Sequence, residues 1–145
     1  MSGIRRQEME KLRVDWDDLD EVQVNQAFYK GQYFTGWACT FFKDGRIEDE
    51  MEFRDGAQTG LYHKYDCNGR LLREEHYLYG SLHGYARSWH INGQLVSEEL
   101  YQGSVLMTER QWDMQGTLIR DYHIDPQDSR IEILKKIKLY AQLPD

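Results

Sequence analysis

The chain has 145 residues and a formal net charge of −7, which suits one small domain and argues against the basic face that nucleic acids bind. Aromatic residues make up 13% of the chain, with ten Tyr and four Trp, and this favours strands and half-buried surfaces over a deep aliphatic core. The sequence has no apolar h-region near its N-terminus and no run of about 18 apolar residues, so we expect a cytoplasmic protein that does not enter a membrane.

Residues 1–27 are expected to form an N-terminal cap, because repeat arrays need atypical units at their ends. Ile4 to Leu12 predicts a weak helix. Glu21 to Phe28 alternates polar and apolar residues, with Val22 and Val24 on one side, and predicts a first strand from an eroded repeat.

Residues 28–124 contain a repeat of 23–24 residues, set by glycines at 45, 69, 93 and 116. Each glycine closes a turn dipeptide such as Asn68-Gly69. An aromatic residue comes four positions before it, an aliphatic residue two positions after it and an acid five positions after it. The columns are Phe41, Tyr65, Trp89 and Trp112, then Ile47, Leu71, Leu95 and Leu118, then Glu50, Glu74, Glu98 and Asp121. The repeat predicts a mainly β fold, a single twisted antiparallel sheet of successive hairpins.

The turn dipeptides predict two-residue loops of type I′, which pair the flanking residues outward from the glycine. This count places His63 opposite Glu74 and Tyr65 opposite Leu72. It also brings acids and bases together in other repeats, with Arg87 opposite Glu98 and Arg110 opposite Asp121, and it sets Gly36, Gly60 and Gly84 opposite Phe53, Tyr77 and Tyr101. Opposite charges across strands contribute roughly 0.2–1 kcal/mol each. In the fourth unit Gly103 comes one residue early and Met107 replaces a loop glycine, so the array is expected to end there.

Both faces of the predicted sheet carry apolar residues. One face carries the aromatic column with Leu72, Val96 and Ile119, and the other carries Phe53, Tyr77 and Tyr101 with the aliphatic column. A sheet with two partly apolar faces needs covers, and uncovered apolar area is a candidate binding surface.

Residues 125–145 predict a C-terminal capping helix that runs to about Gln142. Asp125 or Ser129 is a candidate N-cap, and Pro126 suits the first turn. An apolar stripe at helical spacing consists of Ile133, Leu134, Ile137, Tyr140 and Ala141.

The spacing of aromatic residue, glycines and Xaa-Gly-Arg-Leu, as in Phe53 to Gly60 followed by Asn68-Gly69-Arg70-Leu71, resembles the MORN-repeat variant. It is similar to the bacterial antitoxin proteins built from that repeat, which are called YwqK-like. The resemblance covers about residues 28–123. It implies an antitoxin or immunity protein of a toxin system and supplies no catalytic residues.

No motif for catalysis, a cofactor or a metal site is present. Cys39 and Cys67 lack the spacing of zinc ligands and are expected to be reduced thiols. Glu74 and Glu75 are adjacent on a predicted strand and point to opposite faces, so they do not form a catalytic pair. The histidines fall at repeated strand positions, and we expect a non-enzymatic protein.

We therefore expect a protein that binds and neutralises a cognate protein toxin, such as a basic nuclease or another polymorphic-toxin effector domain. The candidate contacts are Trp37, Tyr62, Tyr85 and Trp89 with Glu48, Glu75 and Glu99, taken from both faces. An alternative is a non-catalytic MORN-like scaffold that touches an acidic membrane surface. The basic residues are scattered except for Lys135, Lys136 and Lys138, so this reading ranks second. Edge strands also permit a homodimer.

Overall fold

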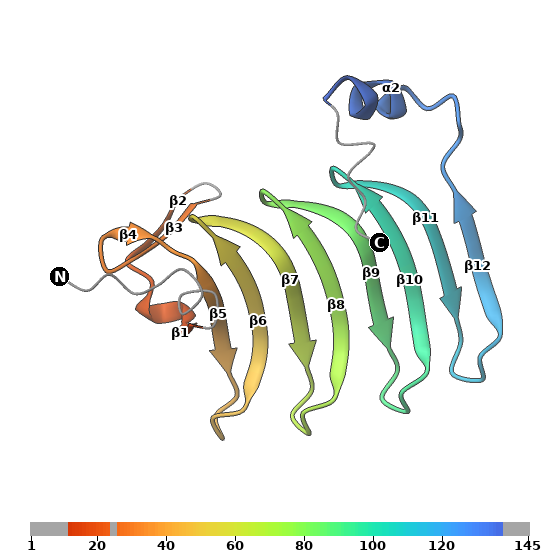
Figure 1. Ribbon diagram of the computed structural model, residues 1–145. Coiled ribbons are helices and arrows are strands. Elements are labelled where there is room, and N and C mark those ends of the chain that lie inside the picture. The colour runs from red at the N-terminus through yellow and green to blue at the C-terminus, as the bar shows by residue number, and fades with distance from the viewer. Residues whose placement is uncertain (1–11, 24–25, 138–145) are drawn as a thin grey trace.

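The computed structural model describes residues 12–23 and 26–137. The main sheet has nine strands in the order β1-β5-β6-β7-β8-β9-β10-β11-β12. Its strands are β1 (Arg13–Asp15), β5 (Gly36–Phe41), β6 (Ile47–Arg54), β7 (Ala57–Tyr65), β8 (Leu71–Leu78), β9 (Ser81–Trp89), β10 (Leu95–Gln102), β11 (Val105–Trp112) and β12 (Leu118–His123). From β5 onward each strand pairs antiparallel with the next, and Figure 1 shows them side by side in chain order. The prediction of a mainly β sheet of successive hairpins is confirmed.

The N-terminal part differs from the single strand predicted for Glu21 to Phe28. Instead, β2 (Glu21–Gln23) and β3 (Gln26–Tyr29) pair antiparallel, with Glu21 opposite Phe28, and β4 (Gln32–Tyr33) completes a second, three-stranded sheet. Alternating polarity fits one long strand or two short ones equally well, so the sequence did not separate them. The helix predicted for residues 4–12 lies, apart from Leu12, outside the described residues.

A hydrophobic cluster joins the N-terminal elements to the first hairpin. β1 pairs parallel with β5, and the 3-10 helix η1 (Trp16–Asp18) follows β1. The buried members of the cluster are Val14, Ala27, Phe34, Ala38 and Phe53. Phe34 is 1% exposed, so this end of the main sheet is covered.

The turns at the Xaa-Gly dipeptides are three-residue loops, and the predicted two-residue type I′ loops are wrong at these positions. At Asn68-Gly69, only the glycine has a positive φ, of 80°. The amide of Gly69 donates to the carbonyl of Asp66, and the amide of Asp66 donates to the carbonyl of Arg70, both at 2.9 Å. The Asp66 carboxylate also accepts from the amides of Asn68 and Arg70, which favours a type I turn.

A bulge just inside each of these turns restores the predicted charge pairing. Tyr65 lies opposite Leu71, not Leu72, whereas Lys64 lies opposite Arg73 and His63 opposite Glu74. The longer loop and the bulge offset each other, so the pairing is correct from His63 onward. The same shift brings the aliphatic column opposite the aromatic column and not onto the other face, in the pairs Phe41–Ile47, Tyr65–Leu71, Trp89–Leu95 and Trp112–Leu118.

The type I′ geometry occurs at the return turns on the other edge of the array. Tyr79 and Gly80 both have positive φ, of 46° and 82°, between the paired residues Leu78 and Ser81. In the fourth unit Gly103 and Ser104 occupy the same two positions, so that loop is not one residue short. Met107 replaces the column glycine, as predicted, because it comes nine residues before Gly116, just as Gly84 comes nine residues before Gly93.

The C-terminal helix α2 (Ser129–Lys136) begins between the two predicted starts, and its predicted end near Gln142 lies outside the described residues. Its N-cap is Asp128, whose carboxylate accepts from the amide of Arg130 at 2.9 Å, so neither Asp125 nor Ser129 caps it. Ile131 and Leu134 are buried and pack with Met107 of β11. Ile133 and Ile137 are 57% and 55% exposed, because the buried side of the helix is set by the position of Met107 and not by the widest apolar stripe. None of the described helices is long and apolar enough to cross a membrane.

Candidate protein-binding surface

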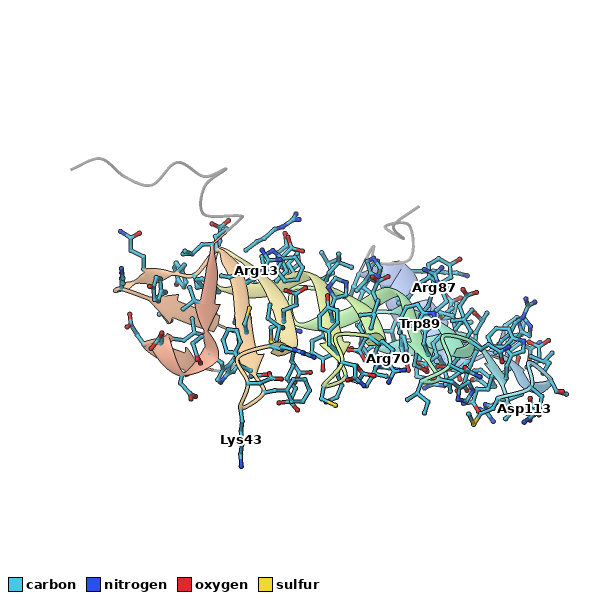
Figure 2. The ribbon with its side chains drawn as sticks, turned by 90° about the horizontal axis from the view of Figure 1, so that it is seen from below. Arg13, Lys43, Arg70, Arg87, Trp89 and Asp113 are labelled. Carbon is cyan, nitrogen blue, oxygen red and sulfur yellow. The ribbon has the colours of Figure 1, made fainter. Side chains whose placement is uncertain are left out.

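The two faces of the main sheet carry different chemistry. Side chains alternate between faces along each strand, and directly opposite residues share a face. We call the face with His63 and Arg87 the ladder face, and the face with Tyr62, Tyr77 and Tyr101 the tyrosine face. Figure 2 shows Arg13 and Arg87 on the same side of the sheet, although they come from opposite ends of it.

The ladder face carries a continuous row of charges across seven strands, which we call the charge ladder. Neighbours in the row lie directly opposite each other in the order Glu50, His63, Glu74, Arg87, Glu98, Arg110 and Asp121. Acid and base alternate throughout. Arg87 donates to Glu98 at 2.8 Å, and Arg110 lies 3.7 Å from Asp121. The sequence predicted the pairs within hairpins, and the structure joins them into one row.

His63 links the two acids on either side of it. Its Nδ1 lies 3.0 Å from Glu50 and its Nε2 lies 2.9 Å from Glu74. The hydrogen bond with Glu50 raises the pKa of His63, against the effect of burial, and the bond with Glu74 adds to it. The same contact with His63 lowers the pKa of Glu50. The protonated imidazole therefore fits this position best, since it donates from both nitrogens.

Aromatic side chains flank the charge ladder. Trp37 stacks on His63 with ring centroids 5.9 Å apart, and the Arg13 guanidinium lies 5.4 Å from the Trp37 ring. Arg87 lies 4.8 Å from the ring of Tyr85. Trp89 is half-buried and lies close to Arg87 (Figure 2). These stacked pairs hold Trp37 and Tyr85 in place.

Exposed apolar residues gather at the last two hairpin turns. Ile91 and Ile119 are both 62% exposed, Met114 is 49% exposed and Leu118 is 48% exposed. The side-chain amide of Asn92 donates to the carbonyl of Met114 at 3.4 Å, so these two turns are adjacent. We call Ile91, Met114, Leu118 and Ile119 the distal apolar patch. Exposed apolar residues that gather in one region make it a candidate interaction surface.

On the tyrosine face, the carboxylates are hydrogen-bonded within the sheet. Glu75 accepts from Tyr77 at 2.7 Å and from Arg73, and it is 9% exposed. Arg73 also reaches Glu99 at 3.4 Å. Burial, and then hydrogen bonding to Glu99, raises the pKa of Tyr101 to about 12. This network stabilises the sheet and leaves little free acid for a partner.

The structure places the predicted contacts on two faces and does not bring them into one site. Trp37, Glu48, Tyr85 and Trp89 lie on the ladder face, whereas Tyr62, Glu75 and Glu99 lie on the tyrosine face. Their role in binding stays a prediction. The distal apolar patch was not among the predicted contacts. Two of its residues, Ile91 and Met114, lie in hairpin turns, where polar residues are usual. An apolar side chain at such a position could have indicated a binding surface from the sequence.

Catalytic and metal chemistry find little support in the described part of the chain. No group of three or more His, Cys, Asp or Glu residues there is arranged to hold a metal ion. Cys39 is buried, and burial raises the pKa of its thiol to about 11, whereas Cys67 is exposed. A thiol with a raised pKa is a poor nucleophile.

Comparison with known proteins gives one informative relative. No family model matches the chain, and no solved structure matches it. The chain is 41% identical over 128 residues to the immunity protein YwqK of Bacillus subtilis (strain 168), an alignment that covers 84% of this chain and 83% of the relative. Similarity of this extent shows that the chain belongs to the family of YwqK-like immunity proteins.

Proposed function

We propose that this protein is an immunity protein that binds a cognate protein toxin in the cytoplasm and neutralises it by direct contact. The observation that carries the proposal is the 41% identity to a curated immunity protein over most of both chains. The architecture supports it, because a rigid sheet presents side chains to a partner with little loss of conformational entropy on binding.

The contact surface we propose is the distal part of the ladder face. It combines the half-buried Trp89 with the exposed Ile91, Met114 and Ile119. Binding hot spots are enriched in Trp, Tyr and Arg surrounded by residues that exclude water. The net charge of −7 suits a toxin with a basic active cleft, such as a nuclease.

The experiment that tests this function is co-expression with the product of the adjacent upstream gene. We expect that product to arrest growth when expressed alone, and this chain to restore growth by forming a stable complex that can be purified. A neighbour that is harmless, or that does not bind, removes this candidate toxin and with it the main functional support. Co-sedimentation with anionic lipid vesicles then tests the membrane scaffold.

The contact surface is tested separately by Trp89→Ala. We expect this variant to weaken toxin binding by about 2 kcal/mol, as hot-spot truncations do, while its melting temperature falls by only a few degrees. Tyr79→Ala is the control, since Tyr79 is 75% exposed at a return turn away from this surface. If both variants bind like the wild type, the toxin docks elsewhere.

A further inference from the structure

The two ends of the main sheet differ in what packs beside their outermost strands. At one end β1 pairs with β5, and the N-terminal elements bury Phe34 and Phe53 against the first hairpin. At the other end β12 pairs with β11 and is the outermost strand among the described residues (Figure 1). Helix α2 packs on Met107 of β11, and no strand of the described residues pairs with the outer side of β12.

The outer side of β12 has the features of a strand that receives another strand. An edge strand presents unpaired amides and carbonyls, which are a template for a further strand. Five of the six residues of β12 are exposed. Leu118 and Ile119 are 48% and 62% exposed, so the edge also offers apolar side chains.

The charge ladder ends on this edge with an acid. Inside the row, Glu74 lies between His63 and Arg87, and Glu98 lies between Arg87 and Arg110, so each of these acids has a base on both sides. Asp121 lies opposite Arg110 on the inner side, 3.7 Å away, and His123 of its own strand lies 3.2 Å from it. No described residue lies opposite it on the outer side, and its side chain is 44% exposed. A further strand that places a Lys or Arg opposite Asp121 would continue the alternation.

A second copy of β12 does not supply that base without a penalty. When two copies of one strand pair antiparallel about a two-fold axis normal to the sheet, side chains of the same face lie opposite each other. Centring the pair on Arg120 sets two arginines against each other, and centring it on Asp121 sets two acids against each other. Centring it on Tyr122 does set Asp121 against His123, but it also sets the apolar Ile119 against Asp125, which lies beyond the end of β12.

We propose that the outer edge of β12 receives a β-strand of the toxin, which carries a basic residue opposite Asp121 and an apolar residue against Ile119. This inference rests on the proposed immunity function and names the partner's mode of docking. The toxin strand extends the main sheet by one, and the distal apolar patch and Trp89 contact the rest of the toxin surface.

The test uses the full chain and the toxin identified by the co-expression experiment. Asp121→Lys and Ile119→Lys alter the edge. Two further variants are controls. Glu132→Lys, on α2, changes the net charge by the same amount as Asp121→Lys. Phe41→Lys matches Ile119→Lys, because it adds a charge at an exposed apolar residue of the first hairpin, at the opposite end of the sheet. We expect each edge variant to weaken the dissociation constant at least about tenfold and each control to change it less than about twofold. Melting curves establish that all four variants fold.

Hydrogen exchange of the β12 amides supplies a second readout. In the free protein we expect the outward amides of β12 to exchange rapidly, and in the complex we expect them to be protected. The docking mode is overturned if the edge variants bind like the wild type, or if the β12 amides stay unprotected in the complex. Neither result contradicts the immunity function. Protection already present in the free protein means that a second copy or the chain's own end occupies the edge, which also overturns it. If wild-type protein does not bind the toxin, the proposed function itself fails.

Discussion

At the residue scale, His63 is the side chain with the most defined electrostatic role. It lies between two carboxylates, stacks on Trp37, and is 15% exposed. A neutral imidazole donates one hydrogen bond and leaves the other acid facing a lone pair, whereas the imidazolium satisfies both. The stability of the fold is therefore linked to the charge on this ring.

We predict that the free energy of unfolding is greatest between about pH 4.5 and 6.5. The pKa of His63 is raised in the folded state, so its contribution is complete below its ordinary value of 6.5 and is lost as the pH rises through the folded-state pKa. The pKa of Glu50 is lowered, so its contribution is present above 4.5 and is lost as the pH falls. Urea denaturation from pH 4 to 9 measures both limbs.

The matched variant is His63→Gln, which keeps a polar side chain that does not titrate. We expect it to cost about 1–2 kcal/mol at pH 6 and to remove most of the decline in stability between pH 6 and 8. An equal decline in both proteins would show that other groups cause it.

Glu75 was predicted as a partner contact, but its carboxylate is hydrogen-bonded inside the sheet and therefore contributes to stability. We predict that Glu75→Lys destabilises the protein by about 3 kcal/mol, because it places a charge beside Arg73 in a buried position and removes the acceptor of Tyr77. Glu48→Lys is the comparison, as no buried network surrounds Glu48. Thermal melts separate the two variants, and equal melting temperatures would contradict the structural role of Glu75.

At the element scale, the hairpin turns are linked to one another by the residue after the glycine. The Arg46 guanidinium donates to the carbonyl of Cys67 in the next turn at 2.7 Å, and Arg70 donates to the carbonyl of Ile91 at 3.0 Å. The arginine of the Xaa-Gly-Arg motif thus connects successive hairpins. In the third repeat Gln94 follows the glycine, and Asn92 contacts the next turn instead.

We predict that Arg70→Ala lowers the free energy of unfolding by about 1 kcal/mol, the usual net contribution of an intramolecular hydrogen bond. Arg110→Ala removes an exposed arginine of the ladder, whose contact with Asp121 is longer, at 3.7 Å, and should cost less. Chemical denaturation compares the two. An effect of Arg70→Ala no larger than that of Arg110→Ala would mean that the turn contact adds nothing.

At the scale of the whole molecule, stability is distributed along the array, because each hairpin contacts chiefly its neighbours. The two hydrophobic clusters lie far apart in the sequence, one around Phe34 and one around Met107, Ile131 and Leu134. The first closes the N-terminal end of the sheet, and the second leaves the β12 edge open. This asymmetry is the physical basis for the docking mode proposed for the β12 edge.

We predict that Phe34→Ala costs about 3–5 kcal/mol, since Phe34 is 1% exposed and its removal opens a cavity in the N-terminal cluster. The local effect should be confined to that end, so native-state hydrogen exchange should rise in β5 and β6 and change little in β11. A uniform rise along the sheet would show that the array unfolds as one unit.

The repeat, the order of the hairpins and the acid–base pairs inside every hairpin but the first could all be predicted from the amino-acid pattern alone. This was possible because the two-residue period of a strand and the position of each glycine fix the register to within one residue. The tertiary structure decided the rest. The Asp66 carboxylate selects the turn type, parallel pairing of β1 closes one end, and Met107 decides which side of α2 is buried. The open β12 edge also depends on the whole fold, because exposure of a strand is a property of what packs beside it and not of its own residues.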